Sequence, residues 1–101
     1  MLTIDRWNLP TMPDQEELRG RLEAEGYTVY LWGDPPGRTY APHAHDEDQS
    51  HWIVCGALAI SVDGEEYVLT SGDRDYLPAG TVHSARVVGG EEVVYLIGAR
   101  S

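Results

Sequence analysis

The sequence predicts an all-β fold, an antiparallel sandwich or barrel with one helix near its N-terminus. Turn residues are abundant, with 11 glycines and 6 prolines among 101 residues. Short segments of alternating apolar and polar residues are separated by turn signals roughly every 8–12 residues, as in sandwiches and barrels. The length is typical of one domain, so we expect residues 1–101 to form a single domain.

The one predicted helix covers about residues 13–25. Pro13 suits the first turn of a helix, and the acidic residues that follow it favour the positive end of the helix dipole. Leu18 and Leu22 share one face, and Gly26 can end the helix in a left-handed backbone conformation.

Alternation with a period of two begins after Gly26. The predicted strands are residues 27–32, a segment that emerges from the turn at Gly37, residues 49–54, residues 58–62, a returning segment through Tyr67 and Leu69, residues 82–88 and residues 93–97. Asp63-Gly64 is a strong signal for a two-residue hairpin between the fourth and fifth of these strands.

The chain carries a net charge of −10, from seven basic and 17 acidic residues. This charge repels phosphate backbones and anionic membrane surfaces, so we expect neither nucleic acid nor a membrane as partner. No apolar run approaches the ~18 residues of a membrane helix, and no secretory signal is visible, which predicts a cytoplasmic protein. The single cysteine, Cys55, can form no intrachain disulfide and is expected to be a small buried apolar residue.

Three of the four histidines lie in the segment PHAHDEDQSHW, and the fourth, His83, lies in PAGTVHSA. On a strand, His43 and His45 would project from the same face and offer two nitrogen ligands for a metal. The other interpretation is a pair of partly exposed loop histidines. His83 can join them only if the sheet closes on itself. His51 shares the parity of Gln49 on the next strand, so both are expected to face the interior.

The spacing of these residues resembles that of the cupins, small antiparallel barrels of the double-stranded β-helix or jelly-roll type. The first cupin motif, G-x5-H-x-H-x3or4-E-x6-G, is matched within residues 37–56 by Gly37, His43, His45, Gln49 and Gly56, with glutamine where glutamate is usual. The second motif, G-x5-P-x-G-x2-H-x3-N, is matched within residues 72–87 by Gly72, Pro78, Gly80 and His83, with Val87 where asparagine is usual. The resemblance is to small single-domain cupins of the conserved-barrel type.

The resemblance implies that His43, His45 and His83 bind one divalent metal ion in the mouth of the barrel, with Gln49 as a further ligand. An amide oxygen is a neutral donor. The site would therefore keep one more positive charge than a site of three histidines and a carboxylate. Iron, zinc, nickel and manganese all remain open as the ion.

Other residues nearby compete for roles at this site. Glu47 or Asp48 could swing in as a carboxylate ligand. His51 could be a fourth nitrogen ligand, a general base beside the metal, or a core imidazole with a hydrogen-bond partner. Trp52 has the opposite parity to His51, so we expect it to point away from the pocket and into the contact of a homodimer.

A cupin of this kind is implied to act on a small molecule. The form we favour is an iron-dependent, dioxygenase-like metalloenzyme with His51 as its candidate proton acceptor. The alternatives are a metal-dependent sugar isomerase or epimerase, and a ligand-binding or sensor cupin without turnover. The expected partners are a small-molecule substrate or ligand and a second copy of the chain.

Overall fold

The computed structural model describes residues 2–101, which contain one helix and nine strands. The helix α1 covers Gln15–Ala24. The strands are β1 (Thr3–Asp5), β2 (Thr28–Asp34), β3 (Thr39–His43), β4 (Asp48–Cys55), β5 (Leu58–Val62), β6 (Glu65–Leu69), β7 (Arg74–Tyr76), β8 (His83–Val87) and β9 (Val93–Arg100). No helix in this part of the chain has the length and apolar composition needed to cross a membrane.

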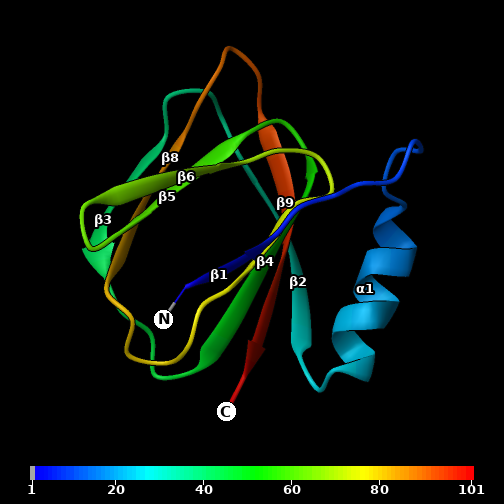
Figure 1. Cartoon of the computed structure of the whole chain (residues 1–101), viewed down its shortest axis with the longest axis horizontal. Coiled ribbons are helices and arrows are strands. Elements are labelled where there is room, and N and C mark those ends of the chain that lie inside the picture. The colour runs from blue at the N-terminus through cyan, green and yellow to red at the C-terminus, as the bar shows by residue number, and fades with distance from the viewer. Residues whose placement is uncertain (1) are drawn as a thin grey trace.

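The strands form two antiparallel sheets, with α1 on the outside (Figure 1). One sheet has the strand order β1-β7-β4-β9-β2, and the other has the order β3-β8-β5-β6. Pairing joins distant parts of the chain: in the β3–β8 pair, Tyr40 lies opposite Ala85 and His43 lies opposite His83. The predicted all-β fold with one helix is confirmed, and the closure that brings the two histidine segments together is present.

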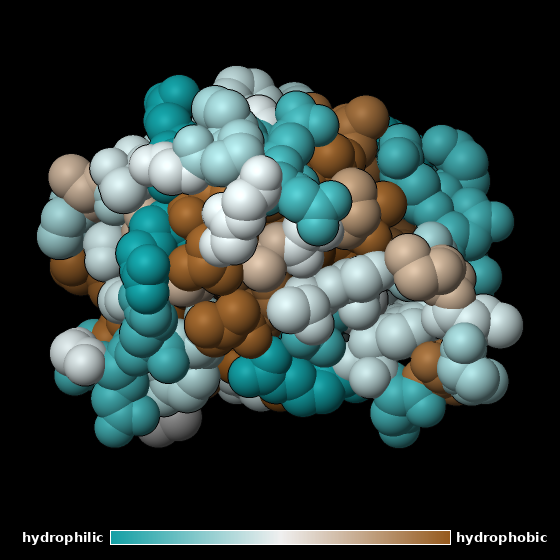
Figure 2. Space-filling model, turned by 90° about the horizontal axis from the view of Figure 1, so that it is seen from above, coloured by the Kyte–Doolittle hydropathy of each residue, from teal (hydrophilic) through white to brown (hydrophobic). Residues whose placement is uncertain are grey.

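Two apolar clusters lie on opposite sides of the five-stranded sheet. The cluster between the two sheets comprises Ile53, Leu58, Ile60, Leu69, Val87, Val93 and Tyr95. The cluster between this sheet and α1 comprises Leu18, Leu22, Tyr27, Trp52 and Leu96. Strands β4 and β9 supply both clusters, because successive side chains of a strand point to opposite faces. Seen from above, hydrophobic residues gather in the middle of the molecule, between hydrophilic residues on either side (Figure 2).

The helix prediction is confirmed to within two residues at each end. Asp14 caps the helix, because its side chain accepts a hydrogen bond from the backbone N–H of Glu16 at 3.0 Å. Pro13 therefore precedes the cap instead of occupying the first turn. Leu18 and Leu22 are buried against the outer face of the five-stranded sheet, as their shared helix face predicts.

The predicted strands correspond to β2, β3, β4, β5, β6, β8 and β9. Asp63 and Gly64 have φ angles of 53° and 80°, the left-handed backbone of a two-residue hairpin between β5 and β6. The sequence did not predict β1 and β7, because three residues are too few to show a period. A register shift precedes His43, where β3 ends, so His45 lies beyond the strand. The prediction of a histidine pair on one strand face is therefore wrong.

Two further predictions about β4 need correction. Trp52 does point away from the barrel interior, but it is only 5% exposed because α1 covers it. Its indole Nε1 donates to the carbonyl of Gly72 at 2.8 Å, so the predicted dimer contact through Trp52 is wrong. Cys55 is exposed rather than buried. The β4–β9 register shifts between Ile53 and Cys55, which breaks the alternation of faces at the end of the strand.

Candidate metal centre

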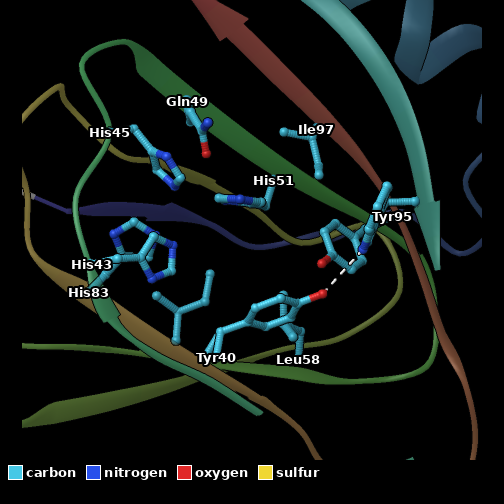
Figure 3. A pocket seen from close by; sticks show the side chains of 12 residues that line it. Tyr40, His43, His45, Gln49, His51, Leu58, His83, Tyr95 and Ile97 are labelled. Atoms are coloured by element: carbon cyan, nitrogen blue, oxygen red, sulfur yellow. Dashed lines mark hydrogen bonds between the residues drawn. The ribbon is translucent and has the colours of Figure 1, made fainter. Parts of the chain in front are cut away.

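Three histidines from the two motifs converge inside the barrel (Figure 3). His43 is the last residue of β3 and His83 is the first of β8, and the pairing of these strands sets them opposite each other. His45 lies just beyond β3, where its backbone carbonyl accepts a hydrogen bond from the N–H of Gly80 at 2.8 Å. The ring centroids are 4.8 Å apart for His43–His45, 4.4 Å for His43–His83 and 5.1 Å for His45–His83.

The ring nitrogens of these histidines suit a divalent metal ion. One ligand nitrogen from each ring lies within 4.8 Å of the others, a spacing at which the three rings could hold one ion. Nδ1 of His43 lies 2.7 Å from the carbonyl oxygen of Ala41, and Nδ1 of His83 lies 3.0 Å from that of Thr81. A carbonyl only accepts, so each Nδ1 carries the hydrogen and each Nε2 is left to coordinate.

Burial favours the neutral form of two of these rings, which is the form that binds a metal. Burial lowers the pKa of His45 below its ordinary value of 6.5, and repulsion from His43 and His51 lowers it further. Burial also lowers the pKa of His83, and it outweighs the hydrogen bond to the Thr81 carbonyl, which acts to raise that pKa. At neutral pH the two rings can therefore bind an ion without first losing a proton.

Gln49 stands at the usual glutamate position of the first motif and lines the same cavity as the histidines. Its carboxamide lies near His45 (Figure 3). In residues 2–101, the side chains close enough to share a metal ion are the three histidines, and neither Glu47 nor Asp48 is among them. Asp48 instead accepts a hydrogen bond from the N–H of Ala79 at 2.8 Å. Neither acidic alternative is therefore part of the histidine cluster, and Gln49 stays a predicted ligand.

His51 faces the same cavity and is held by a buried carboxylate. Asp75 of β7 is fully buried and accepts hydrogen bonds from the His51 backbone N–H at 2.7 Å and from its Nδ1 at 3.0 Å. Burial acts to lower the pKa of His51, but the Asp75 carboxylate outweighs it and raises the pKa. The His51 and His83 ring centroids are 6.5 Å apart, so His51 lies beside the three-histidine cluster and outside it.

The histidines open onto a cavity of about 240 Å³ inside the barrel. Its walls are apolar and its far end is aromatic, with lining residues Leu58, Ile60, Ala85 and Ile97 in the walls and Trp32, Tyr40 and Tyr95 at the end. Sequence reasoning missed the aromatic end and also missed Asp75. Tyr95 shares the parity of Ile97 on β9, which is a usable signal for an inward side chain. Asp75 lies on a strand too short to predict.

Comparisons with known proteins identify the family. Residues 30–97 match the Cupin domain family. Quercetin 2,3-dioxygenase of Bacillus subtilis is 35% identical to the chain over 69 residues, which cover 67% of this chain and 20% of that protein. The chain spans a fifth or less of the length of the curated relatives that it matches.

Solved structures share the fold. KdgF from Halomonas sp. has a TM-score of 0.62 at 27% sequence identity, over 74% of this chain and 70% of that one. A Cupin 2 conserved barrel domain protein from Salinispora arenicola has a TM-score of 0.68 at 20% identity, over 99% of this chain and 76% of that one. At the latter identity the likeness concerns the fold alone. Because the family match spans most of the chain and both histidine motifs meet inside the barrel, the protein belongs to the cupin domain family.

Proposed function

We propose that this cupin binds a divalent metal ion and acts as a small-molecule oxygenase of the iron-dependent, dioxygenase-like kind. The observation that carries the proposal is the convergence of His43, His45 and His83 on an apolar cavity. The 35% identity to quercetin 2,3-dioxygenase over 69 residues supports the oxygenase form. That relative is about five times longer than the matched segment, so its substrate is not carried over.

The proposed ligand set is neutral. Three imidazoles and the carboxamide of Gln49 leave the double positive charge of the ion uncompensated. A bound ion of this kind polarises oxygen donors of a substrate and, if it is iron, supplies electrons to dioxygen. The chain contributes the apolar walls, which hold the substrate body away from water, and the histidine end, which orients its oxygen atoms.

His51 is the proposed proton acceptor. Because its Nδ1 hydrogen is directed at Asp75, the lone pair of the ring remains on Nε2, which can accept a proton on the cavity side. The His51 ring centroid is 6.5 Å from that of His83 and 5.9 Å from that of Tyr95. A substrate that extends from the histidines toward the aromatic end therefore passes beside His51. Asp75 acts as a positioning residue, because it holds the ring.

Metal analysis of the purified protein, before and after anaerobic loading with Fe(II), tests the metal site. We expect one ion per chain and its loss in His83→Ala. His51→Gln is the matched control, because it changes a histidine in the same cavity outside the three-histidine cluster, and it should retain the ion. A protein that neither contains nor takes up iron, nickel, zinc or manganese would contradict the proposal.

Oxygen uptake tests the reaction. Iron-loaded protein, screened with small diketones, flavonols and thiols, is expected to consume dioxygen with one of these classes. His51→Gln should lower turnover by roughly 10²–10⁴-fold, the usual contribution of a general base, while metal content stays constant. Asp75→Asn should lower turnover in the same direction. Unchanged turnover in His51→Gln would remove His51 from the mechanism.

A metal-dependent isomerase is the second candidate, because the His51–Asp75 pair can move a proton without dioxygen. Substrate-dependent exchange of a carbon-bound proton with deuterium from the solvent, without oxygen uptake, would identify this activity. Metal binding with neither signal would leave a ligand-binding or sensor protein.

A further inference from the structure

The end of the cavity away from the three histidines is built around a buried carboxylate. Asp34, the last residue of β2, is 2% exposed. Its Oδ1 accepts hydrogen bonds from the Tyr40 hydroxyl at 2.6 Å and from Trp32 Nε1 at 3.2 Å. Its Oδ2 accepts a hydrogen bond from the Tyr95 hydroxyl at 2.8 Å. None of the ion pairs found in residues 2–101 involves Asp34, so the groups that donate hydrogen bonds to its carboxylate are all uncharged.

This hydrogen bonding fixes the direction of both phenolic protons. Each tyrosine hydroxyl has one hydrogen, and Asp34 accepts both, so toward the cavity the two oxygens offer only lone pairs. The Tyr40 oxygen also accepts from Trp32 Nε1 at 3.2 Å, which leaves the Tyr95 oxygen as the freer acceptor. Burial and the hydrogen bond to Asp34 raise the pKa of both tyrosines, so both hydroxyls keep their protons. Figure 3 shows the Tyr40 and Tyr95 hydroxyls at the opposite end of the cavity from His43 and His83.

We propose that this aromatic end binds an uncharged O–H or N–H donor, such as a phenolic hydroxyl, on a substrate whose other end faces the three histidines. The inference rests on the proposed function for the histidine end and adds the substrate class. A carboxylate or phosphate is disfavoured here, because its oxygens would meet tyrosine lone pairs and the negative charge of Asp34. The same charge attracts an ammonium group, but Asp34 already accepts three hydrogen bonds and the burial of the cation is costly, so the proposal is for an uncharged donor.

The cavity volume limits the enclosed part of the substrate to about one ring. A volume of 240 Å³ corresponds to about eight water molecules at ~30 Å³ each. The aliphatic side chains between the two ends offer no hydrogen bonds, so the middle of the substrate is expected to be apolar except where it passes His51. A single substituted aromatic ring meets these conditions.

Calorimetry on zinc-loaded protein tests the proposal without redox chemistry. The reference probe is benzohydroxamate, a one-ring compound whose oxygen pair binds metal ions. We expect 3- or 4-hydroxybenzohydroxamate to bind about three- to tenfold more tightly, the effect of one hydrogen bond, and 4-carboxybenzohydroxamate to bind more weakly than the reference. If neither hydroxyl isomer binds more tightly than benzohydroxamate, the proposal is overturned.

Two substitutions assign the effect to these residues. Tyr95→Phe removes the freer acceptor, so it should abolish the preference for the hydroxyl probe over benzohydroxamate. Asp34→Asn keeps the shape of the side chain but adds an N–H donor that can turn a tyrosine proton into the cavity, so the preference should fall. Tyr76→Phe and Asp5→Asn are matched controls, because the Tyr76 hydroxyl donates to Asp5 at 3.0 Å in an exposed position. Loss of the preference in the controls as well would overturn the assignment.

Metal-free protein separates this inference from the proposed function. After treatment with a chelator, phenol is expected to bind about three- to tenfold more tightly than anisole, in which a methyl group replaces the donated proton. If phenol is preferred here but the protein takes up no metal ion in the metal analysis, the site for an O–H or N–H donor is supported and the proposed function is contradicted. Metal uptake with no preference for the hydroxyl probe in either assay would overturn the donor site alone.

Discussion

In the proposed metal site, we expect Gln49 to set how strongly a hard cation is held. Its carboxamide presents a neutral oxygen, whereas the glutamate usual at this position of the cupin motif presents a negative charge. Burial lowers the pKa of His45 and of His83, so both rings are neutral at pH 7 and bring no negative charge to offset that of a bound ion. An ion held by such a set attracts an anionic substrate oxygen more strongly, and is released more readily, than one held with a carboxylate.

We expect Gln49→Glu to tighten binding of a divalent ion by on the order of tenfold, because it places an opposite charge close to the ion. Competition with a chelator of known affinity measures this on zinc-loaded protein. Gln15→Glu adds the same charge on α1 and should leave the affinity unchanged. Equal affinity in Gln49→Glu and the unsubstituted protein would show that side chain 49 does not reach the ion.

The positions of the three clustered histidines could be predicted, because His43, His45 and His83 follow two motifs that specify spacing. The carboxylates that organise the cavity could not. Asp34 begins the turn-forming run DPPG, and Asp75 lies on a strand of three residues. His51 lies 24 residues from Asp75, and Tyr95 lies 61 residues from Asp34, so sheet pairing brings these partners together and no local pattern shows it. Tyr40 is nearer in the chain, six residues from Asp34.

The turn after β4 requires a glycine because another segment lies against it. Gly56 has a φ of 83°, and a Cβ at this position would lie 2.4 Å from the carbonyl oxygen of Glu92 and 2.7 Å from Cα of Val93. Gly89 has the same φ of 83°, but open space surrounds the position of its Cβ. Comparison of the two separates the cost of a left-handed backbone from the cost of the close contact.

We expect Gly89→Ala to lower the free energy of unfolding by about 1–2 kcal/mol, the cost of a left-handed backbone for a residue with a Cβ. Gly56→Ala should lower it by about 1–3 kcal/mol more, because the added methyl group overlaps backbone atoms next to β9. Urea unfolding followed by circular dichroism measures both losses. Equal losses would mean that the chain around Glu92 moves away without cost.

Asp73 joins the N-terminal segment to the turn before β7. It is 5% exposed and accepts hydrogen bonds from the backbone N–H groups of Trp7 at 2.8 Å and Thr70 at 2.9 Å. The guanidinium of Arg6 donates a third bond at 3.0 Å, and the Thr70 hydroxyl donates a fourth at 3.3 Å. Burial acts to raise the pKa of Asp73, but these hydrogen bonds outweigh it and hold the pKa below its ordinary value of 3.8. The fold therefore stabilises the ionised form.

We expect Asp73→Asn to lower the free energy of unfolding by about 2 kcal/mol at pH 7, because an amide cannot replace a carboxylate that accepts four hydrogen bonds. A depressed pKa gives stability that is complete above the unfolded-state value and is lost as pH falls through the folded-state value. The difference between the variant and the unsubstituted protein should therefore shrink below pH 3.8. Urea unfolding across this range measures it.

Asp63→Asn is the matched control for Asp73→Asn. It removes the same charge at an exposed hairpin turn, where asparagine tolerates the left-handed backbone, so stability should hardly change. A stability difference for Asp73→Asn that persists at the lowest pH would show that the ionised carboxylate is not its source.

Elements long enough to show a period could be predicted, and shorter ones could not. Strands β2, β5 and β9 have five or more residues each, whereas β1 and β7 have three residues each. The outward direction of Trp52 follows from the period of β4, but the period does not say what covers that face. Here α1 covers it, which is why the side chain is buried and unavailable to a second copy.

At the scale of the whole molecule, strand β2 offers a surface for association. It forms one edge of the five-stranded sheet and pairs only with β9 in the described part of the chain. Tyr30, Leu31 and Trp32 are 55%, 48% and 49% exposed, and since successive side chains point to opposite faces, both faces of the edge are apolar. A second copy related by a two-fold axis can pair β2 with β2 and cover these side chains.

We therefore predict a homodimer formed through β2, in place of a contact through Trp52. Leu31→Arg puts a charge on the edge strand and should shift the protein to a monomer. Met12→Arg makes the same charge change at a side chain 74% exposed in the loop before α1, and should leave the dimer intact. Two copies of a chain with net charge −10 repel each other, so added salt should tighten the association. Sedimentation velocity over a range of protein and salt concentrations measures this, and a monomer at every concentration would contradict the prediction.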